Sequence, residues 1–70
     1  MPYIDVALFE GRLDSTTEPR LLAAITDAVA TVLGEDVRPA TWVVLREIPR
    51  SRWGFGGVAQ PAAPADGGAR

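Results

Sequence analysis

The sequence predicts an α/β (α+β) fold in which a single β-α-β unit forms the protomer. Residues 3–9 and 41–48 alternate their side chains with the period of two that is typical of strands. Between these segments, apolar residues recur at helical spacing along one side only. A strand, a helix and a second strand of these lengths favour a right-handed crossover, so we expect the two strands to be parallel.

The first strand is predicted at residues 3–9, which are rich in β-branched and aromatic types. Ile4, Val6 and Leu8 fall on one face of this strand. Gly11 follows at the point where the chain must turn away, and glycine relaxes the backbone at such a turn.

The helix is predicted to begin near Thr16 and to stop at Gly34. Ser15 and Glu18 have the spacing of a capping box, and Pro19 is tolerated only within a first helical turn. The apolar stripe of the helix comprises Leu21, Leu22, Ile25, Ala28, Val29, Val32 and Leu33. Because this stripe is one-sided, it needs a sheet to cover.

The second strand is predicted at residues 41–48 and is ended by Pro49. Alternation places Trp42, Val44 and Arg46 on one face and Val43 and Leu45 on the other. Residues 53–57, Trp-Gly-Phe-Gly-Gly, predict a tight turn or a short hairpin. We therefore expect one domain over residues 1–57 and a mobile tail, rich in Pro, Ala and Gly, over residues 58–70.

The composition excludes several kinds of chemistry. The chain has no histidine, cysteine or lysine, which removes disulfides, zinc-thiolate sites and Schiff bases on a side-chain amine. The scattered carboxylates form no metal-ligand pattern, so we expect neither a metal nor a cofactor. A net charge of −2 argues against nucleic acid as the main partner. We expect no membrane partner and a cytoplasmic protein, since no apolar run approaches the roughly 20 residues that a span needs.

The small size predicts self-association. Two strands and one helix leave both edges of the sheet unpaired, in a chain at the lower limit of core size. We therefore expect an oligomer that assembles through sheet pairing.

Pro2 is the candidate base. It follows Met1 directly, and a small second residue normally permits removal of the initiator methionine. The mature chain would then begin with a free secondary amine, which in an apolar pocket among cations would serve as a base near neutral pH. A proline at this position also starts many edge strands without any chemical role. The catalytic role of the Pro2 amine is favoured because the chain has no histidine or lysine that could serve as a nitrogen base.

Several motifs together resemble the 4-oxalocrotonate tautomerase family. They are Pro2, the Val6-x-Leu8-x-Glu10-Gly11-Arg12 strand end, Ile25-Thr26-x-Ala28-Val29, Gly34, Val43-Val44-Leu45-x-Glu47 and Trp53-Gly54-x-Gly56-Gly57. The similarity covers residues 2–57. It implies a β-α-β tautomerase fold assembled as a trimer of dimers, with Pro2 moving a proton between carbon and oxygen of an enol acid. It also implies that Arg12 binds a substrate carboxylate and that Trp53 lines the pocket.

The sequence departs from this family at Trp42, which stands where the family archetype has a second arginine. Arg46 lies four residues later on the same predicted strand face and is a candidate replacement, although the displacement is roughly 13 Å. Arg50 and Arg52 are further candidates. Trp42 and Arg46 therefore join Arg12 and Trp53 in the predicted substrate-binding set.

The predicted function is that of an isomerase, a cofactor-independent keto–enol tautomerase acting on a small 2-oxo or enol acid. One alternative keeps Pro2 but makes the reaction a hydration or dehalogenation, in which Glu10 or Glu47 would activate water. The other is a non-catalytic or partner subunit of a mixed hexamer, in place of a homohexamer.

Overall fold

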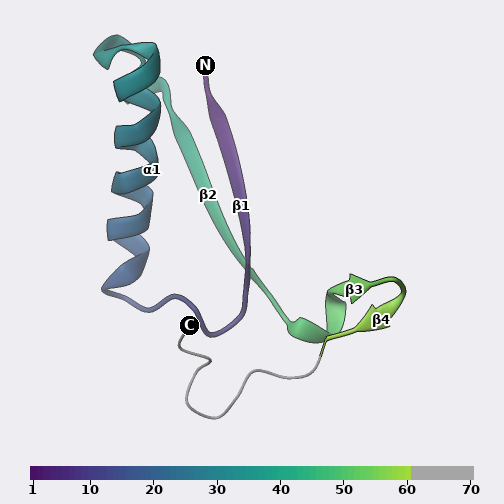
Figure 1. Ribbon diagram of the computed structural model, residues 1–70. Coiled ribbons are helices and arrows are strands. Elements are labelled where there is room, and N and C mark those ends of the chain that lie inside the picture. The colour runs from purple at the N-terminus through teal and green to yellow at the C-terminus, as the bar shows by residue number, and fades with distance from the viewer. Residues whose placement is uncertain (61–70) are drawn as a thin grey trace.

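The computed structural model describes residues 1–60, which form a two-stranded sheet, a long helix and a small C-terminal hairpin (Figure 1). The elements are β1 (Tyr3–Phe9), α1 (Thr17–Leu33), β2 (Trp42–Ile48), β3 (Gly54–Phe55) and β4 (Val58–Ala59). Short 3₁₀ helices at Glu35–Ala40 and Arg50–Arg52 precede and follow β2. Among the described residues, no helix combines the length and the apolarity that a membrane span requires.

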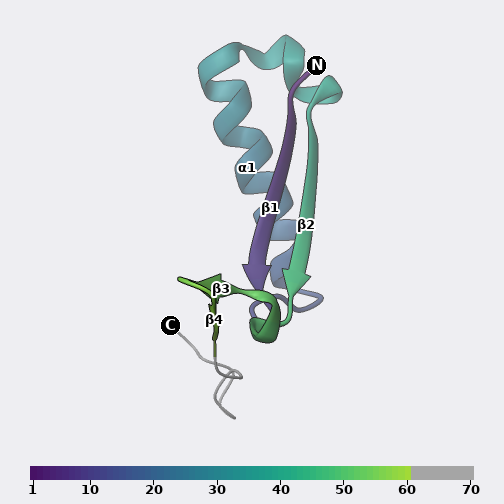
Figure 2. The same cartoon turned by 90° about the vertical axis from the view of Figure 1, so that its right-hand side faces the viewer.

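β1 and β2 pair in parallel along their whole length, with Tyr3 opposite Trp42 and Phe9 opposite Ile48. α1 connects them and lies over one face of the sheet, as the two views show (Figure 1, Figure 2). The predicted β-α-β arrangement with parallel strands is confirmed.

The start of α1 is capped by Asp14, one residue before the predicted cap. The Asp14 carboxylate accepts the backbone N–H groups of Thr16 and Thr17, each at 2.8 Å. In return, the Thr17 hydroxyl accepts the N–H of Asp14 at 2.8 Å. The reciprocal pair of a capping box is therefore Asp14 with Thr17, and the predicted pair of Ser15 with Glu18 is wrong because the turn closes earlier.

The core lies between α1 and one face of the sheet, and it is thin. Ala30 is the buried apolar residue of the described chain, with 3% of its surface exposed. Around it lie half-buried side chains of α1 and of the strands, namely Leu22, Ile25, Val29, Ile4, Val6, Val43 and Leu45. Three members of the predicted stripe, Ala28, Val32 and Leu33, are exposed instead.

The other face of the sheet is uncovered in the single chain. Tyr3 and Trp42, which are opposite each other in the register, expose 59% and 58% of their surfaces, and Val44 exposes 37%. On the same face, Arg46 Nε donates to Asp5 Oδ1 at 2.8 Å. A face that carries two large exposed aromatics is typical of an interaction surface.

The C-terminal hairpin differs from its predicted position. β3 pairs with β4 in the antiparallel direction, with Phe55 opposite Val58, and the turn uses Gly56 and Gly57 at φ 62° and 87°. β4 thus lies in the first residues of the segment that was expected to be a tail. The rest of that expectation falls on residues 61–70, which lie outside the described part of the chain.

Candidate active site

Pro2 lies at the amino end of the sheet, directly beside Trp42. The Trp42 N–H donates to the carbonyl oxygen of Pro2 at 2.9 Å, which extends the ladder by one bond beyond β1. Pro2 is half-buried, whereas Met1 before it exposes 77% of its surface. The structure therefore brings two predicted site residues together at this end of the sheet.

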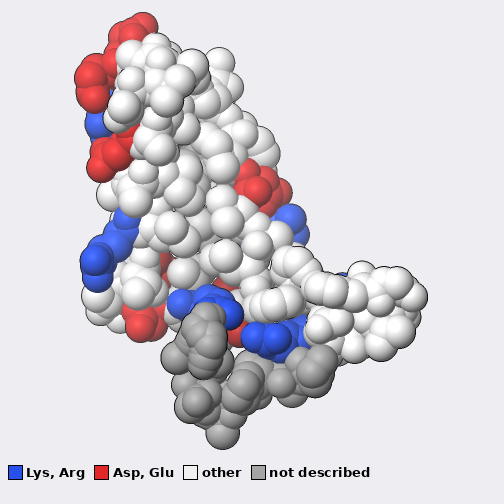
Figure 3. Space-filling model, in the orientation of Figure 1, with Lys and Arg blue, Asp and Glu red and all other residues white. Residues whose placement is uncertain are grey.

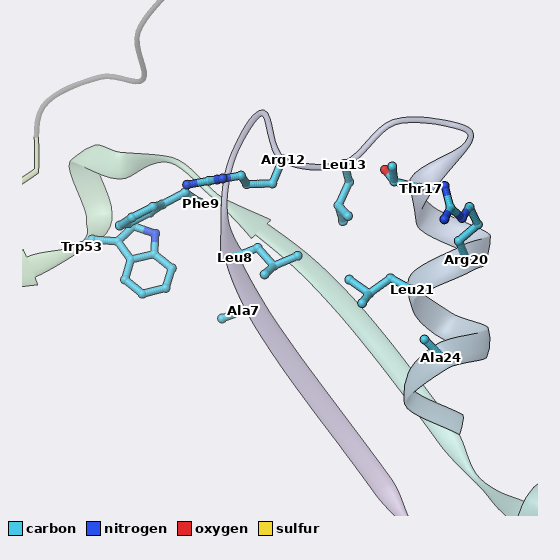
Figure 4. A pocket seen from close by; sticks show the side chains of 10 residues that line it. All are labelled: Ala7, Leu8, Phe9, Arg12, Leu13, Thr17, Arg20, Leu21, Ala24 and Trp53. Atoms are coloured by element: carbon cyan, nitrogen blue, oxygen red, sulfur yellow. The ribbon is translucent and has the colours of Figure 1, made fainter. Parts of the chain in front are cut away.

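Arg12 and Trp53 lie at the opposite end, where they line an open groove of about 720 Å³ (Figure 4). The groove runs from the end of β1, across the loop after it, to the first turns of α1. Its lining is mostly apolar and consists of Ala7, Leu8, Phe9, Leu13, Leu21, Ala24 and Trp53, with Arg12, Thr17 and Arg20 as the polar members. Among the described residues, β1 contributes to this lining and β2 does not.

An aromatic corner closes one end of the groove. The rings of Phe9 and Trp53 meet edge to face, with centroids 4.6 Å apart and an interplanar angle of 69°. Trp53 is held there because its indole N–H donates to the carbonyl oxygen of Ile48 at 3.1 Å. The guanidinium carbon of Arg50 lies 4.1 Å from the centre of the Phe9 ring. Arg50 is thus engaged in a cation–π contact, and it is a poor candidate for a free substrate-binding cation.

The loop that carries Arg12 is fixed at its base. The Glu10 N–H donates to the carbonyl oxygen of Ile48 at 3.1 Å, and Gly11 then turns the chain at φ 88°. The next two amides, those of Arg12 and Leu13, both donate to Oε2 of Glu47 at 3.0 Å. The Arg12 side chain is exposed and extends toward Phe9 and Trp53 (Figure 4).

Arg46 belongs to neither end of the sheet. It lies in the middle of the uncovered face, opposite Ala7 in the register. Its hydrogen bond with Asp5, together with the charge of that carboxylate, raises the pKa of the Arg46 guanidinium above its ordinary value. The ion pair with Asp5 engages Arg46 in the single chain. The structure therefore offers no support for Arg46 as the cation that replaces the family arginine at Trp42.

Pro2 and Arg12 are therefore separated by the full length of β1. Strands rise about 3.3 Å per residue, so the seven residues Tyr3–Phe9 place the two ends about 20 Å apart. Within one chain the predicted base and the predicted carboxylate ligand do not meet.

Arg20 as a lining residue and Glu47 as a partner of the loop amides were not predicted from the sequence. Arg20 follows Thr17 by three residues and precedes Ala24 by four, which is the spacing that places side chains on one helix face, so helical periodicity was a usable signal. Glu47 gave no such signal, because its contacts with the loop depend on strand register. Among residues 1–60, no three acidic side chains are grouped closely enough to ligate a metal ion.

Basic atoms gather around the groove end of the molecule, whereas a group of acidic atoms marks the far end of α1 (Figure 3). The arginines of the groove end come from the loop after β1, the start of α1 and the segment after β2, namely Arg12, Arg20, Arg50 and Arg52. A local excess of positive charge attracts anionic ligands.

The fold and the groove together define a class of small β-α-β proteins with a proline at the start of the first strand and a cationic, aromatic site at its end. A family model described as "Tautomerase enzyme" matches residues 2–60. The chain belongs to the tautomerase family, and the resemblance to 4-oxalocrotonate tautomerases is confirmed.

Two similar proteins support this assignment. A probable tautomerase of Ralstonia nicotianae is 36% identical over 63 residues, which cover 90% of this chain and 87% of that protein. A crystal structure of an apo, unfused 4-oxalocrotonate tautomerase (4-OT) superimposes with a TM-score of 0.71 at 36% identity. That match covers 84% of this chain and 93% of the other.

Proposed function

We propose that the protein is a keto–enol tautomerase of a small 2-oxo acid and that it uses the amine of Pro2 after removal of Met1. The observation that carries this proposal is the groove in which Arg12, without an ion-pair partner among the described residues, extends along the Phe9–Trp53 wall. A guanidinium binds a carboxylate bidentately and stays charged at any working pH. An apolar wall beside it suits the carbon skeleton of the same acid.

In the proposed reaction, the neutral amine of Pro2 takes a proton from the enol oxygen or from the carbon next to the carbonyl group. The same proton, now on the ammonium, is then delivered to the other atom, so the amine returns to its starting state. Arg12 holds the carboxylate, and cations or backbone donors in a site that excludes water stabilise the developing enolate oxygen. Burial among cations also disfavours the protonated amine, which keeps the base available.

The separation of Pro2 from Arg12 implies that a site is completed by two chains. β1 has a free edge on the side of the groove. If two copies pair β1 with β1 in the antiparallel direction, the Pro2 end of each chain meets the Arg12 end of the other. This arrangement would pair the free edge of β1 and would also bring the amine of Pro2 and the guanidinium of Arg12 into one site.

Two exposed surfaces of the single chain favour a larger assembly. The exposed residues Ala24 and Ala28, together with Thr17, Leu21 and Val32, recur at helical spacing and form a stripe that we call the α1 flank. Part of the α1 flank lines the groove beside β1, so antiparallel pairing of β1 strands would also bring two α1 helices together. The uncovered sheet faces, with Tyr3 and Trp42, remain for contacts between dimers. A homohexamer built as a trimer of dimers is the proposed state.

A second candidate is a partner subunit in a mixed hexamer, and it is favoured by the lack of a free second cation beside Pro2 among the described residues. Trp42 lies beside Pro2, while Arg46 is held by Asp5 and Arg50 by Phe9. A second chain would then supply the missing cation. If the purified chain alone forms one homogeneous assembly and converts phenylenolpyruvate, this candidate is excluded. The hydratase alternative has no comparable support, because Oε2 of Glu47 accepts two backbone amides and neither Glu10 nor Glu47 is among the residues that line the groove.

The proposed function is tested at Pro2. Intact-mass measurement first establishes that Met1 is absent, since retained methionine leaves Pro2 without a free amine. Pro2→Ala replaces the secondary amine by a primary amine with a different geometry, so turnover of phenylenolpyruvate should fall while the sedimentation profile stays unchanged. The kcat/KM of the unaltered protein should rise with pH as Pro2 loses its proton, because only the neutral amine accepts one. Full activity of Pro2→Ala, or a flat profile from about pH 5 to 9, would remove the amine from the mechanism.

A further inference from the structure

We infer that Glu47 is a positioning residue for the carboxylate-binding arginine: it holds the backbone of Arg12 so that the guanidinium is presented along the aromatic wall of the groove. This inference rests on the proposed role of Arg12. Glu47 itself lies outside the groove lining, so its effect on an acid would be exerted through the loop.

The register of the sheet places Glu47 where it can perform this task. Glu47 is opposite Leu8, and Leu8 lies two residues before the loop that follows β1. The last bond between the two strand ends runs from Glu10 N–H to the Ile48 carbonyl oxygen. Beyond it, the amides of Arg12 and Leu13 make no backbone hydrogen bond in the described part of the chain. The Glu47 carboxylate replaces the missing strand partner for both of them.

The two hydrogen bonds constrain a segment that is otherwise free to reorient. Gly11 is in the left-handed region at φ 88°, and no heavy atom beyond Gly11 and its two chain neighbours lies within 4 Å of the place where a side chain would begin, so tertiary packing around this position does not fix the turn. On the other side, the Asp14 cap secures the start of α1. Residues 12 and 13 are thus held by Glu47 and followed by a fixed helix start. Both contribute side chains to the groove, Arg12 at its rim and Leu13 in its apolar lining.

Charge and position predict opposite effects of losing Glu47, and this makes the inference testable. A carboxylate close to the site repels a bound anion, so its removal should tighten the binding of an acid if charge alone matters. If Glu47 acts by holding the loop, its removal should weaken the binding of an acid, because Arg12 must be ordered again on every binding event.

The experiment compares Glu47→Ala with Glu47→Gln, which loses the charge but keeps an acceptor oxygen. Glu10→Ala is the matched control, because it removes a carboxylate from the same loop whose side chain makes no hydrogen bond among the described residues. KM is measured for phenylenolpyruvate and for its neutral methyl ester. For Glu47→Ala we expect a rise of about 3- to 10-fold in the KM of the acid, with little change for the ester. Glu47→Gln should stay within about 2-fold of the unaltered protein, and Glu10→Ala should not raise the KM of the acid.

A double variant links the effect to Arg12. In an Arg12→Ala background, Glu47→Ala should raise the KM of the acid no further, because the group that it positions is absent. Amide hydrogen exchange at Arg12 and Leu13, followed by NMR, should accelerate in Glu47→Ala and not in Glu10→Ala.

Three results would overturn the inference: equal changes for acid and ester, an additive effect in the Arg12→Ala background, or unchanged exchange at the two amides. If Arg12→Ala alone changes the KM of the acid and that of the ester equally, the role proposed for Arg12 is wrong, and so is the inference about Glu47. Inactivity of the unaltered protein would count against the proposed function, and the exchange measurement would still decide whether Glu47 holds the loop.

Discussion

On the proposed function, Trp42 is the residue that we expect to have the greatest effect on substrate choice. Its backbone is bonded to Pro2, and its indole is 58% exposed on the uncovered face of the sheet. Arg38, four residues before it in the sequence, is bound by Glu35 and Asp27 through hydrogen bonds of 2.6 to 3.0 Å, and Arg46, four residues after it, is bound by Asp5. The proline end of the sheet therefore presents an aromatic surface, where on the proposed function a dicarboxylate would need a second cation.

Trp42→Arg tests this reading. The new guanidinium should raise kcat/KM for a 2-oxo dicarboxylate over that for a monocarboxylate, by a factor on the order of ten, because one charge-assisted contact is added. Steady-state kinetics on both substrates measures the ratio. Val44→Arg is the control, since it adds the same charge to the same strand face two residues away. A similar gain in both variants, or an equal change for both substrates, would show that local charge at Trp42 does not set the preference.

At the level of single residues, the sequence suggested Pro2 because the chain has no His, Lys or Cys, whereas Arg12 and Trp53 were suggested by the resemblance to the family. It could not show that Arg46 would be neutralised by Asp5, since that contact joins neighbouring strands and depends on the register. Glu47 was hidden for the same reason: its partners are backbone amides 34 and 35 residues away.

The secondary-structure elements were predicted well where periodicity decides them and less well where a turn decides them. β1 was placed at its observed bounds, whereas the helix cap moved from Ser15 to Asp14. The small width of the two-stranded sheet also explains why part of the apolar stripe of α1 is exposed. Two strands lie about 4.8 Å apart, and a helix with its side chains is about 10 Å wide, so α1 overhangs the sheet that it covers. Ala28 and Val32 lie on this overhang.

The Asp14 cap predicts acid sensitivity of α1. Hydrogen bonds from the backbone N–H groups of Thr17 and Thr16 lower the pKa of the Asp14 carboxyl below its ordinary value of 3.8. Since the folded value is the lower one, the stabilisation is fully present above about pH 4 and is lost as the pH falls through the folded value. Asp14→Ala should therefore lower the thermal midpoint at pH 7, and the difference from the unaltered protein should shrink below pH 4.

Thermal unfolding followed by circular dichroism measures this difference. Asp14→Asn keeps an acceptor and should retain part of the stability without the acid dependence. Ser15→Ala provides the control, because the Ser15 side chain makes no capping hydrogen bond in the structure. If Ser15→Ala lost as much stability as Asp14→Ala, Ser15 and not Asp14 would be the capping residue.

The molecule as a whole leaves most of its large apolar side chains partly or fully uncovered in the single chain. Among the described residues, Ala30 alone is buried, while Tyr3, Trp42, Val32 and Leu33 are among the exposed large side chains. Such a chain gains its apolar burial through assembly more than through its own core. The sequence predicted this need from size alone, but it could not indicate which edge and which helix side would be used.

Ala24→Glu tests the pairing proposed for the α1 flank. A carboxylate placed where two helices approach would be buried without a partner, so sedimentation should show a shift toward smaller species. Ala23→Glu makes the same change one residue away, on an exposed position outside the groove, and should sediment like the unaltered protein. Normal assembly of Ala24→Glu would place the interface elsewhere.

The distance from Pro2 to Arg12 along β1 also has a genetic consequence. On the proposed pairing, each chain gives its proline to one site and its arginine to another, so no site depends on a single chain. A copy defective at Pro2 and a copy defective at Arg12 would each be inactive alone, yet a dimer of the two would contain one site with both residues intact. Duplicated genes of this family could then lose opposite halves of the site and remain dependent on each other, which is a direct route from a self-associating protein to an obligate pair.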